Sequence, residues 1–398
     1  MSTVERMMEE YESRGYGGSD KYVCADCVGN TYLKQFVLNN GTDDNSCDFC
    51  DNDGICVDIE SLCGEIMAAV SYEYERAVDV MGWNNNEGGY YGATTWDSYD
   101  LLVELNNEML LEPGLLEEIS DMINHDIWCE YDPYNLHTSN AYKYMWQRFS
   151  HMVKHKTRYV FFRMTKNNNY YEQPDFLILD HIGDVVYKLG LIKRLPIGTC
   201  FYRGRTHDKD AELKETKDLC SPPFNYAKAN RMSAEGISVF YGANNAAIAL
   251  AEISDGKPYA TVATFVNLRE LNILDLADKD KYAVPSLFDA ERRHLRESTK
   301  FLNELNRDLT RSIEEMKVIE YIPAQVIAEY FRFLYEHNGK RIDGIAYSSS
   351  KDFGETCYVL FFDHKQCLPG EKQELHMINA KQYTYSEVIV RGMRDGKL

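Results

Sequence analysis

The 398-residue chain lacks any uninterrupted apolar run of about 20 residues, the length that a membrane-spanning helix needs. Its first residues, MSTVERMMEEYESRGYGGSDKY, lack the basic stretch followed by an apolar stretch that marks a signal peptide. These two absences argue against a membrane protein and a secreted protein, so we expect a cytoplasmic location. With 44% apolar residues the chain should be globular, and its length favours two or three domains.

Basic residues are scarce in the first part of the chain. Residues 1–150 contain 29 acidic and 7 basic side chains, whereas residues 151–398 contain 34 acidic and 36 basic ones. The net charge of −20 therefore comes from an acidic N-terminal part joined to a nearly neutral C-terminal part. Because an acidic surface repels a phosphate backbone, we do not expect a nucleic-acid partner.

Eleven cysteines are present, but no secretion signal supports disulfide bonds. Four of them, Cys24, Cys27, Cys47 and Cys50, form the pattern C-x2-C-x19-C-x2-C. Two CxxC pairs at this separation predict a tetrahedral thiolate site for zinc. Since four sulfurs close the coordination shell, we expect a structural ion that folds a small zinc ribbon. A reduced, metal-free set of thiols is the alternative.

The spacing of apolar residues divides the rest of the chain into a helical part and a mixed part. Helical spacing from Asp58 to Val78, and again over 101–127 and 140–162, predicts a mainly helical region. The Gly- and Asn-rich stretch 81–100 is typical of a long loop. Later runs predict strands over 199–205, 237–243, 259–266, 271–276, 343–349 and 357–362, and helices over 286–313 and 324–337.

We therefore predict an α+β protein of four segments. Residues 1–56 should form the zinc ribbon and residues 57–165 an acidic helical domain. Residues 166–196 are expected to be a helical connector. A mixed α/β domain, residues 197–398, should contain the strands and the catalytic site.

One carboxylate in the mixed domain is unusual for its surroundings. Glu252 is the only charged residue in the run ISVFYGANNAAIALAEIS, which should form a strand and then a helix. Burying a carboxylate costs free energy unless the residue has a role or a partner. A surface position, or an ion pair with one of the preceding arginines, is the structural alternative.

Three arginines, Arg203, Arg205 and Arg231, precede Glu252 in the same domain. Arginine binds the oxygens of a diphosphate in a bidentate manner, and a carboxylate can stabilise the oxocarbenium-like transition state of glycosidic cleavage. Arginines for an anion, a carboxylate for a sugar and an aromatic residue for a base together suggest cleavage of a dinucleotide at a glycosidic bond.

Six short motifs, in this order, resemble the RES domain family, which is named after an Arg, a Glu and a Ser. They are YRGR at 202–205, PP at 222–223, RMSAEGI at 231–237, FYGA at 240–243 followed by Glu252, YIPAQ at 321–325 and GIAYSS at 344–349. Asn230, Ser233 and Ala324 stand where Gly, Asn and Thr are usual. The N-terminal region resembles the HEPN/RES N-terminal domain, through the sequences CADC and CDFC and the helix with Trp146 and Phe149.

The resemblance implies a fold like that of the ADP-ribosyltransferases, with NAD as substrate. By position, Arg203 would hold phosphate and Glu252 would act on the ribose next to nicotinamide. Tyr241 would pack against nicotinamide or ribose, and Ser349 would complete the catalytic pocket. Further NAD-binding residues would be Arg205, Arg231 and Ser348.

Several functions stay open at this point. The first is an NAD phosphorylase or glycohydrolase with a toxin- or defence-like role, for which phosphate or water is the acceptor. The second is a protein ADP-ribosyltransferase. A third is an RNase of the HEPN type, because six residues separate Arg148 from His155; the acidic charge disfavours it. The N-terminal half could instead be a sensor that answers to an inhibitory or triggering protein, with an inactive catalytic domain as the extreme case. Homo-oligomerisation is also open.

Overall fold

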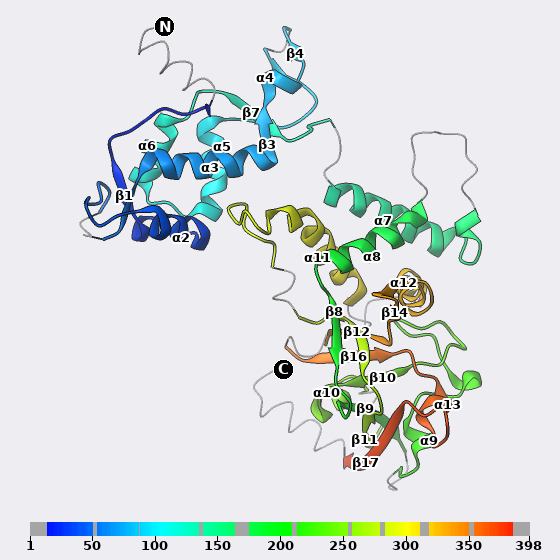
Figure 1. Ribbon diagram of the computed structural model, residues 1–398. Helices are drawn as coiled ribbons and strands as arrows, with labels where there is room; N and C mark the ends of the chain where they lie inside the picture. The colour runs from blue at the N-terminus through cyan, green and yellow to red at the C-terminus, as the bar shows by residue number, and fades with distance from the viewer. Residues whose placement is uncertain are drawn as a thin grey trace. The chain divides into compact units, whose positions relative to one another are not determined.

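The computed structural model describes residues 14–50, 54–86, 88–134, 138–163, 175–208, 213–253, 257–278, 283–310, 318–349 and 354–384. Its contacts divide the chain into two compact units (Figure 1). Unit 1 contains Met1–Thr138 together with Val284–Glu297. Unit 2 contains Ser139–Ala283 and Ser298–Leu398. In the described part of the chain, no helix is long and apolar enough to cross a membrane.

Unit 1 begins with the cysteine-bearing module. Strand β1 (Tyr22–Cys24) pairs in antiparallel fashion with β2 (Cys56–Asp58). Between them in sequence lie a 3-10 turn, η1 (Ala25–Cys27), and helix α2 (Thr31–Asn40). The side chain of Asn30 accepts hydrogen bonds from the N–H groups of Tyr32 and Leu33, which fixes the start of α2.

Helices form most of the rest of unit 1, as the apolar spacing predicts. They are α3 (Ile59–Glu73), α4 (Ala77–Val80), α5 (Ser98–Met109) and α6 (Pro113–Met122). The stretch 81–100 is not a simple loop, because it contains the hairpin β4 (Trp83–Asn84) and β5 (Gly89–Tyr90) and then strand β6 (Thr95–Asp97). A three-stranded sheet has the order β3 (Tyr74–Arg76), β7 (Ile127–Glu130), β6.

A segment from much later in the chain completes the core of unit 1. Leu287 and Phe288 are buried in the same apolar cluster as residues of α3, α5 and α6. The predicted helix over 286–313 is therefore wrong in its first part, because α11 (Arg296–Thr310) starts ten residues later. Asp289 explains the difference, since its side chain accepts hydrogen bonds from the N–H groups of Glu291 and Arg292 and so favours a turn.

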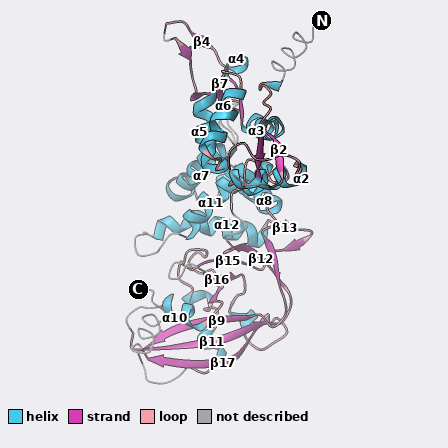
Figure 2. Ribbon diagram, turned by 90° about the vertical axis from the view of Figure 1, so that its left-hand side faces the viewer, coloured by secondary structure: helices cyan, strands magenta, loops and turns pink. Residues whose placement is uncertain are grey.

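Unit 2 is built on an eight-stranded mixed sheet (Figure 2). Across the sheet the strand order is β17-β11-β9-β10-β16-β15-β12-β8, and within it only β12 and β15 pair in parallel. Six strands confirm the sequence prediction; β8 and β17 were not expected. The bounds are β8 (Ile192–Leu195), β9 (Cys200–His207), β10 (Phe240–Ala243), β11 (Tyr259–Asn267), β12 (Leu271–Leu276), β15 (Gly344–Ser348), β16 (Thr356–Leu360) and β17 (Leu375–Thr384).

Side chains alternate between the two faces of this sheet, and each face has its own apolar cluster. One face, named the α10 face, carries Tyr202, Tyr241 and Val359. The other, named the α13 face, carries Phe201 and Phe240. The helices on the α10 face are α7 (Thr138–His155), α8 (Ile178–Lys188), α10 (Ala246–Ala251), α11 and α12 (Ile322–Phe333); those on the α13 face are α9 (Thr216–Leu219) and α13 (His364–Cys367).

Two other predicted segments have different boundaries in the structure. Residues 166–196, expected to be a connector, contain α8 and the edge strand β8, while residues 164–174 lie outside the described part. The helix expected over 324–337 ends at Phe333. After it, β13 (Glu336–His337) and β14 (Lys340–Arg341) form a hairpin, because Asn338 and Gly339 both adopt positive φ, 52° and 70°.

Candidate active site and cysteine cluster

The four predicted cysteine ligands come together in unit 1. The Sγ atom of Cys24 lies 3.4 Å from that of Cys50 and 3.9 Å from that of Cys27, and the sulfurs of Cys27 and Cys47 are 3.7 Å apart. Zn–S bonds of about 2.3 Å in a tetrahedron place sulfurs about 3.8 Å apart. The predicted four-cysteine group is therefore confirmed, and its spacing fits zinc. Cys63 is fully buried in the core and serves packing.

Helix α10 positions Glu252 at its C-terminal end. Asn245 caps the start of the helix by accepting a hydrogen bond from the N–H of Ile248 at 2.9 Å. Ile248, Ala249 and Leu250 are buried, whereas Glu252, just past the last helical residue, is exposed. The surface position, which the sequence left open as the alternative to burial, is therefore the one observed for Glu252.

Two buried side chains nevertheless fix the position of the Glu252 carboxylate. Its Oε1 atom accepts a hydrogen bond from Ser349 Oγ at 2.7 Å, and Cys357 Sγ lies 3.6 Å from the same oxygen. Both donors are buried, with exposed fractions of 1% and 2%. Among the described residues, the second oxygen of Glu252 has no hydrogen-bond partner. One oxygen is thus anchored to the sheet, and the other is available for a ligand.

The Cys357 side chain acts as a neutral donor. Burial, followed by the nearby Glu252 carboxylate, raises the pKa of the Cys357 thiol to about 12. Strand register explains its place, because Cys357 on β16 is opposite Ala243 on β10 and Tyr347 on β15. Directly opposed residues share a face, so this thiol points to the α10 face.

Arg231 lies beside the same group. It is only 8% exposed, and its guanidinium carbon is 5.6 Å from the centre of the Tyr347 ring. Burial raises the pKa of Tyr347 well above its usual range, while the Arg231 charge acts in the opposite direction. Arg231 also favours ionisation of the Cys357 thiol and the Tyr241 hydroxyl. A buried cation therefore accompanies Glu252 on the α10 face.

The predicted Tyr241 is fixed by the turn that carries Arg231. Its hydroxyl accepts a hydrogen bond from the Met232 N–H at 3.1 Å and lies 3.3 Å from Ser233 Oγ. Burial raises the pKa of this hydroxyl. Gln325, on α12, secures the turn by donating from Nε2 to the carbonyls of Asn230 at 2.8 Å and Ser233 at 3.2 Å.

The side chains of Arg203 and Arg205 point to the opposite face of the sheet, the α13 face. The guanidinium carbon of Arg203 is 5.4 Å from the Phe240 ring, and Arg205 donates to the carbonyl of Asp218 in α9. Gly204, between them, faces α10, where an added Cβ would lie 3.0 Å from the carbonyl oxygen of Ala249. Arg203 Nη1 donates to the Tyr241 carbonyl at 2.7 Å, and burial, followed by the Arg205 charge, lowers the pKa of Arg203.

The structure therefore groups the predicted residues unequally. Tyr241, Glu252, Ser349 and Arg231 meet on the α10 face, whereas the Arg203 side chain is on the α13 face. Ser348 donates to the carbonyl of Ala277 at 3.3 Å and does not bond Glu252. Sequence reasoning missed Cys357, which lies outside the motifs, and it assigned no role to Gln325 and Tyr347, which lie within the motifs YIPAQ and GIAYSS.

Two protein families match this chain. Residues 40–167 match the HEPN/RES N-terminal domain 1 family, and residues 207–385 match the RES domain family. The chain is thus a two-domain protein of mixed α and β content. It belongs to the proteins that join an HEPN/RES N-terminal domain to a RES domain, as the motifs indicate. Searches of curated proteins and of solved structures gave no match.

A RES domain indicates an NAD-acting enzyme in general, with a toxin- or defence-like role. The matched range contains Arg231, Tyr241, Glu252 and Ser349, and it begins after Arg203 and Arg205. The group on the α10 face is therefore the part of the predicted site that lies wholly within the matched domain.

Proposed function

We propose that this protein cleaves the bond between nicotinamide and ribose in NAD, as an NAD phosphorylase or glycohydrolase. The observation that carries the proposal is the Glu252 carboxylate, anchored through Oε1 by Ser349 and Cys357 and open at its other oxygen. A fixed carboxylate at the edge of a buried, arginine-bearing face suits a reaction in which positive charge develops on a sugar.

The reaction breaks the bond between C1′ of the ribose and the nicotinamide nitrogen. Nicotinamide leaves with the bonding electron pair and becomes neutral, while the ribose becomes oxocarbenium-like. Glu252 stabilises that charge, and an oxygen of phosphate or water then bonds to C1′. With phosphate the product is ADP-ribose 1-phosphate. With water it is ADP-ribose and a released proton.

Two arginines take different roles in this proposal. Arg231, next to Tyr347 on the α10 face, would bind the diphosphate of NAD, and its guanidinium beside the Glu252 group supports this role. Arg203 acts through the strand, because its hydrogen bond to the Tyr241 carbonyl fixes β10. Tyr241 supplies an aromatic wall for the bound NAD. Arg205 and Ser348 lie on the α13 face of the sheet and have only an indirect role in this proposal.

Product analysis of NAD incubations with and without phosphate tests the proposal. We expect release of nicotinamide by the full-length protein and a loss of about 100-fold or more in Glu252→Gln. Glu235→Gln is a matched control, because Glu235 is an exposed carboxylate in the loop before β10. Undiminished turnover in Glu252→Gln would contradict the site, and absence of NAD cleavage by the unsubstituted protein would contradict the function.

The acceptor and the regulation belong to the same proposal. Label transferred from NAD to a macromolecule would favour protein ADP-ribosylation over the two small-molecule acceptors. We assign the acidic N-terminal region a restraining or triggering role, exerted through a protein partner. Its excess of 22 negative charges over residues 1–150 favours a basic partner surface.

A further inference from the structure

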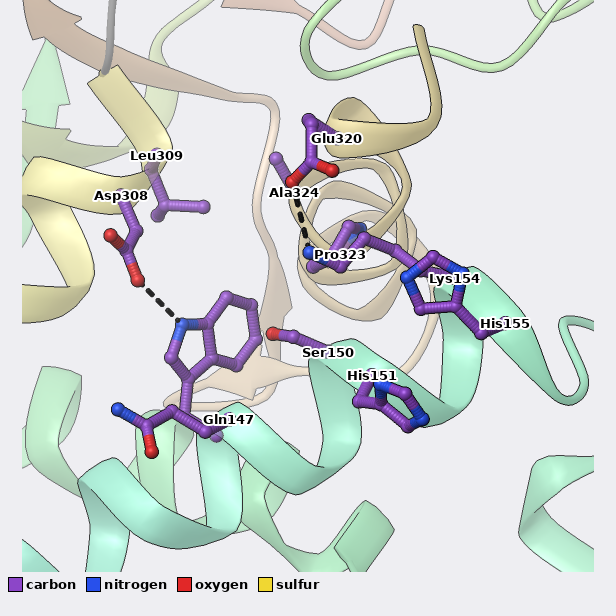
Figure 3. A pocket seen from close by; sticks show the side chains of 11 residues that line it. Gln147, Ser150, His151, Lys154, His155, Asp308, Leu309, Glu320, Pro323 and Ala324 are labelled. Atoms are coloured by element: carbon purple, nitrogen blue, oxygen red, sulfur yellow. Dashed lines mark hydrogen bonds and ion pairs between the residues drawn. The ribbon is translucent and has the colours of Figure 1, made fainter. Parts of the chain in front are cut away.

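A cleft of about 240 Å³ with a mixed polar and apolar lining lies in unit 2 and shares no lining residue with the Glu252 group (Figure 3). One wall is a face of α7. The other walls are the end of α11, the 3-10 turn η8 (Val318–Tyr321) and the first turn of α12. Trp146 and Pro323 give the cleft an apolar side, and two histidines from α7 lie along it.

His151 and His155 are four residues apart on α7, so they lie one above the other on the same helix face. Both side chains are exposed, and their ring centres are 5.0 Å apart. Within the described part of the chain, neither ring has a hydrogen-bond partner. Two adjacent imidazoles without partners can offer lone pairs to one shared ligand.

The distance between the rings suits a single metal ion. With Zn–N bonds of about 2.0 Å and a tetrahedral angle, the ring centres of two histidines on one ion are about 5 Å apart. Two histidines at this helical spacing are also the arrangement by which a helix presents two imidazoles to zinc. The separation of the two ring centres therefore matches that of two histidines on one ion.

Three charged groups that line the cleft already have partners. Lys154 Nζ is 2.9 Å from Glu320, and Trp146 Nε1 donates to Asp308 at 3.1 Å. Lys154 therefore does not present an uncompensated positive charge beside the pair. The donors that remain are imidazole nitrogens, which prefer zinc, copper or nickel to calcium or magnesium.

We propose that His151 and His155 form a second metal site, which binds one divalent transition-metal ion, with water in the remaining coordination positions. This site is independent of the cysteine cluster, which uses only sulfur, and of the proposed reaction on NAD. An ion bound here would link two successive turns of α7 near its C-terminal end.

Cu²⁺ is the probe for this site, added to full-length protein whose cysteine cluster has been saturated with zinc. We expect one Cu²⁺ per chain beyond the cluster, with an electron paramagnetic resonance spectrum that shows coupling to two imidazole nitrogens. His151→Ala and His155→Ala should each weaken binding at least tenfold. Gln147→Ala is the control, since Gln147 lines the same cleft one turn earlier and should leave binding unchanged.

Two results would overturn the proposal. One is the absence of any Cu²⁺ binding beyond the cluster. The other is an unchanged affinity for Cu²⁺ in both histidine variants, or a spectrum of the bound Cu²⁺ that shows sulfur ligands only. Because both side chains are exposed, the substitutions should leave thermal unfolding unchanged, and a matching melting curve verifies that the variants are folded.

Discussion

Glu252 combines exposure with a fixed orientation. The residue is at the surface, yet one of its oxygens is bound by two buried side chains from different strands. A carboxylate that is free to rotate would have to be ordered during the reaction, at the cost of side-chain entropy. Here Ser349 and Cys357 have already ordered it, so the residue can meet a solvent-borne substrate in one defined position.

Removing the Cys357 donor should impair turnover without unfolding the protein. Cys357→Val fills the site with a slightly larger apolar side chain but loses the contact with Glu252 Oε1, and a hydrogen bond from a weak thiol donor contributes about 1 kcal/mol. We expect kcat for NAD cleavage to fall about fivefold with KM unchanged. Cys357→Ser, which retains a donor, should recover most of the activity. Equal kcat in the valine variant and the unsubstituted protein would show that the contact is dispensable.

The two arginines should respond differently to substitution. Arg231→Met removes the cation on the α10 face, so we expect a rise in the KM for NAD of about tenfold. Arg203→Met removes the donor to the Tyr241 carbonyl, so we expect a loss of about 1–2 kcal/mol in the free energy of unfolding. Steady-state kinetics and chemical denaturation of both variants measure these effects. A larger KM effect in Arg203→Met than in Arg231→Met would reverse the two roles.

Local sequence predicted the residue types of the site better than their grouping. Glu252 was identifiable as a single charge in an apolar run, and the RES motifs marked Arg231, Tyr241 and Ser349. Cys357 carries no motif, and its partner is 105 residues away in sequence. The position of Arg203 follows from two-residue alternation, because Phe201 and Arg203 must share a face while Gly204 faces α10.

At the scale of elements, apolar content decided which strands could be predicted. β10 to β12 and the pair β15 and β16 are mainly apolar runs within the sheet, and β9 (CFYRGRTH) begins with an aromatic pair. β8 (IKRL) and β17 (LHMINAKQYT) are the two edge strands, and their polar residues hide the pattern. Helical spacing alone also predicted too early a start for α11. Leu287 and Phe288 fit a helical pattern, but in the structure they lie before the helix and are buried in the core of unit 1.

The segment 284–297 should be essential for the stability of unit 1. Arg296 is 8% exposed and pairs through Nε with Glu73 at 2.6 Å and through Nη1 with Glu108 at 3.1 Å. Arg296→Met leaves these carboxylates without their cation, and breaking such a buried pair costs about 3 kcal/mol.

Chemical denaturation followed by tryptophan fluorescence measures this loss, because Trp96 and Trp128 lie in unit 1. Arg292→Met is the control, since Arg292 is exposed on the same segment and should change stability by less than about 0.5 kcal/mol. A small effect in Arg296→Met would mean that the segment is only loosely held.

At the scale of the whole molecule, the cysteine cluster should hold the first part of the chain together. We expect one tightly bound zinc per chain, and a loss of folded structure in unit 1 when a strong chelator removes it. Cys27→Ser should lower zinc content and the melting temperature, whereas Cys200→Ser, an exposed cysteine outside the cluster, should change neither. Elemental analysis and calorimetry test this. Full stability without zinc would favour the metal-free alternative.

Domain boundaries were the least predictable feature. Helix α7 falls within the match to the N-terminal domain family, yet its residues Phe149 and Val153 are buried in the core of unit 2. Residues 284–297 show the reverse, since they lie within the RES match but belong to unit 1. Composition separates an acidic part from a neutral part of the sequence. It carries no information on which segments of one part pack into the unit formed by the other.

Because residues 284–297 belong to unit 1, they determine when each unit can complete its folding during synthesis. Unit 1 cannot close its core around Leu287 and Phe288 until more than two thirds of the polypeptide has left the ribosome. By then the strands that bear Arg203 and Tyr241 have been made, while β15 and β16, with Tyr347 and Cys357, have not. A chain that stops before residue 284 therefore leaves both units incomplete. Such a fragment contains Glu252 but lacks Ser349 and Cys357, which anchor its carboxylate.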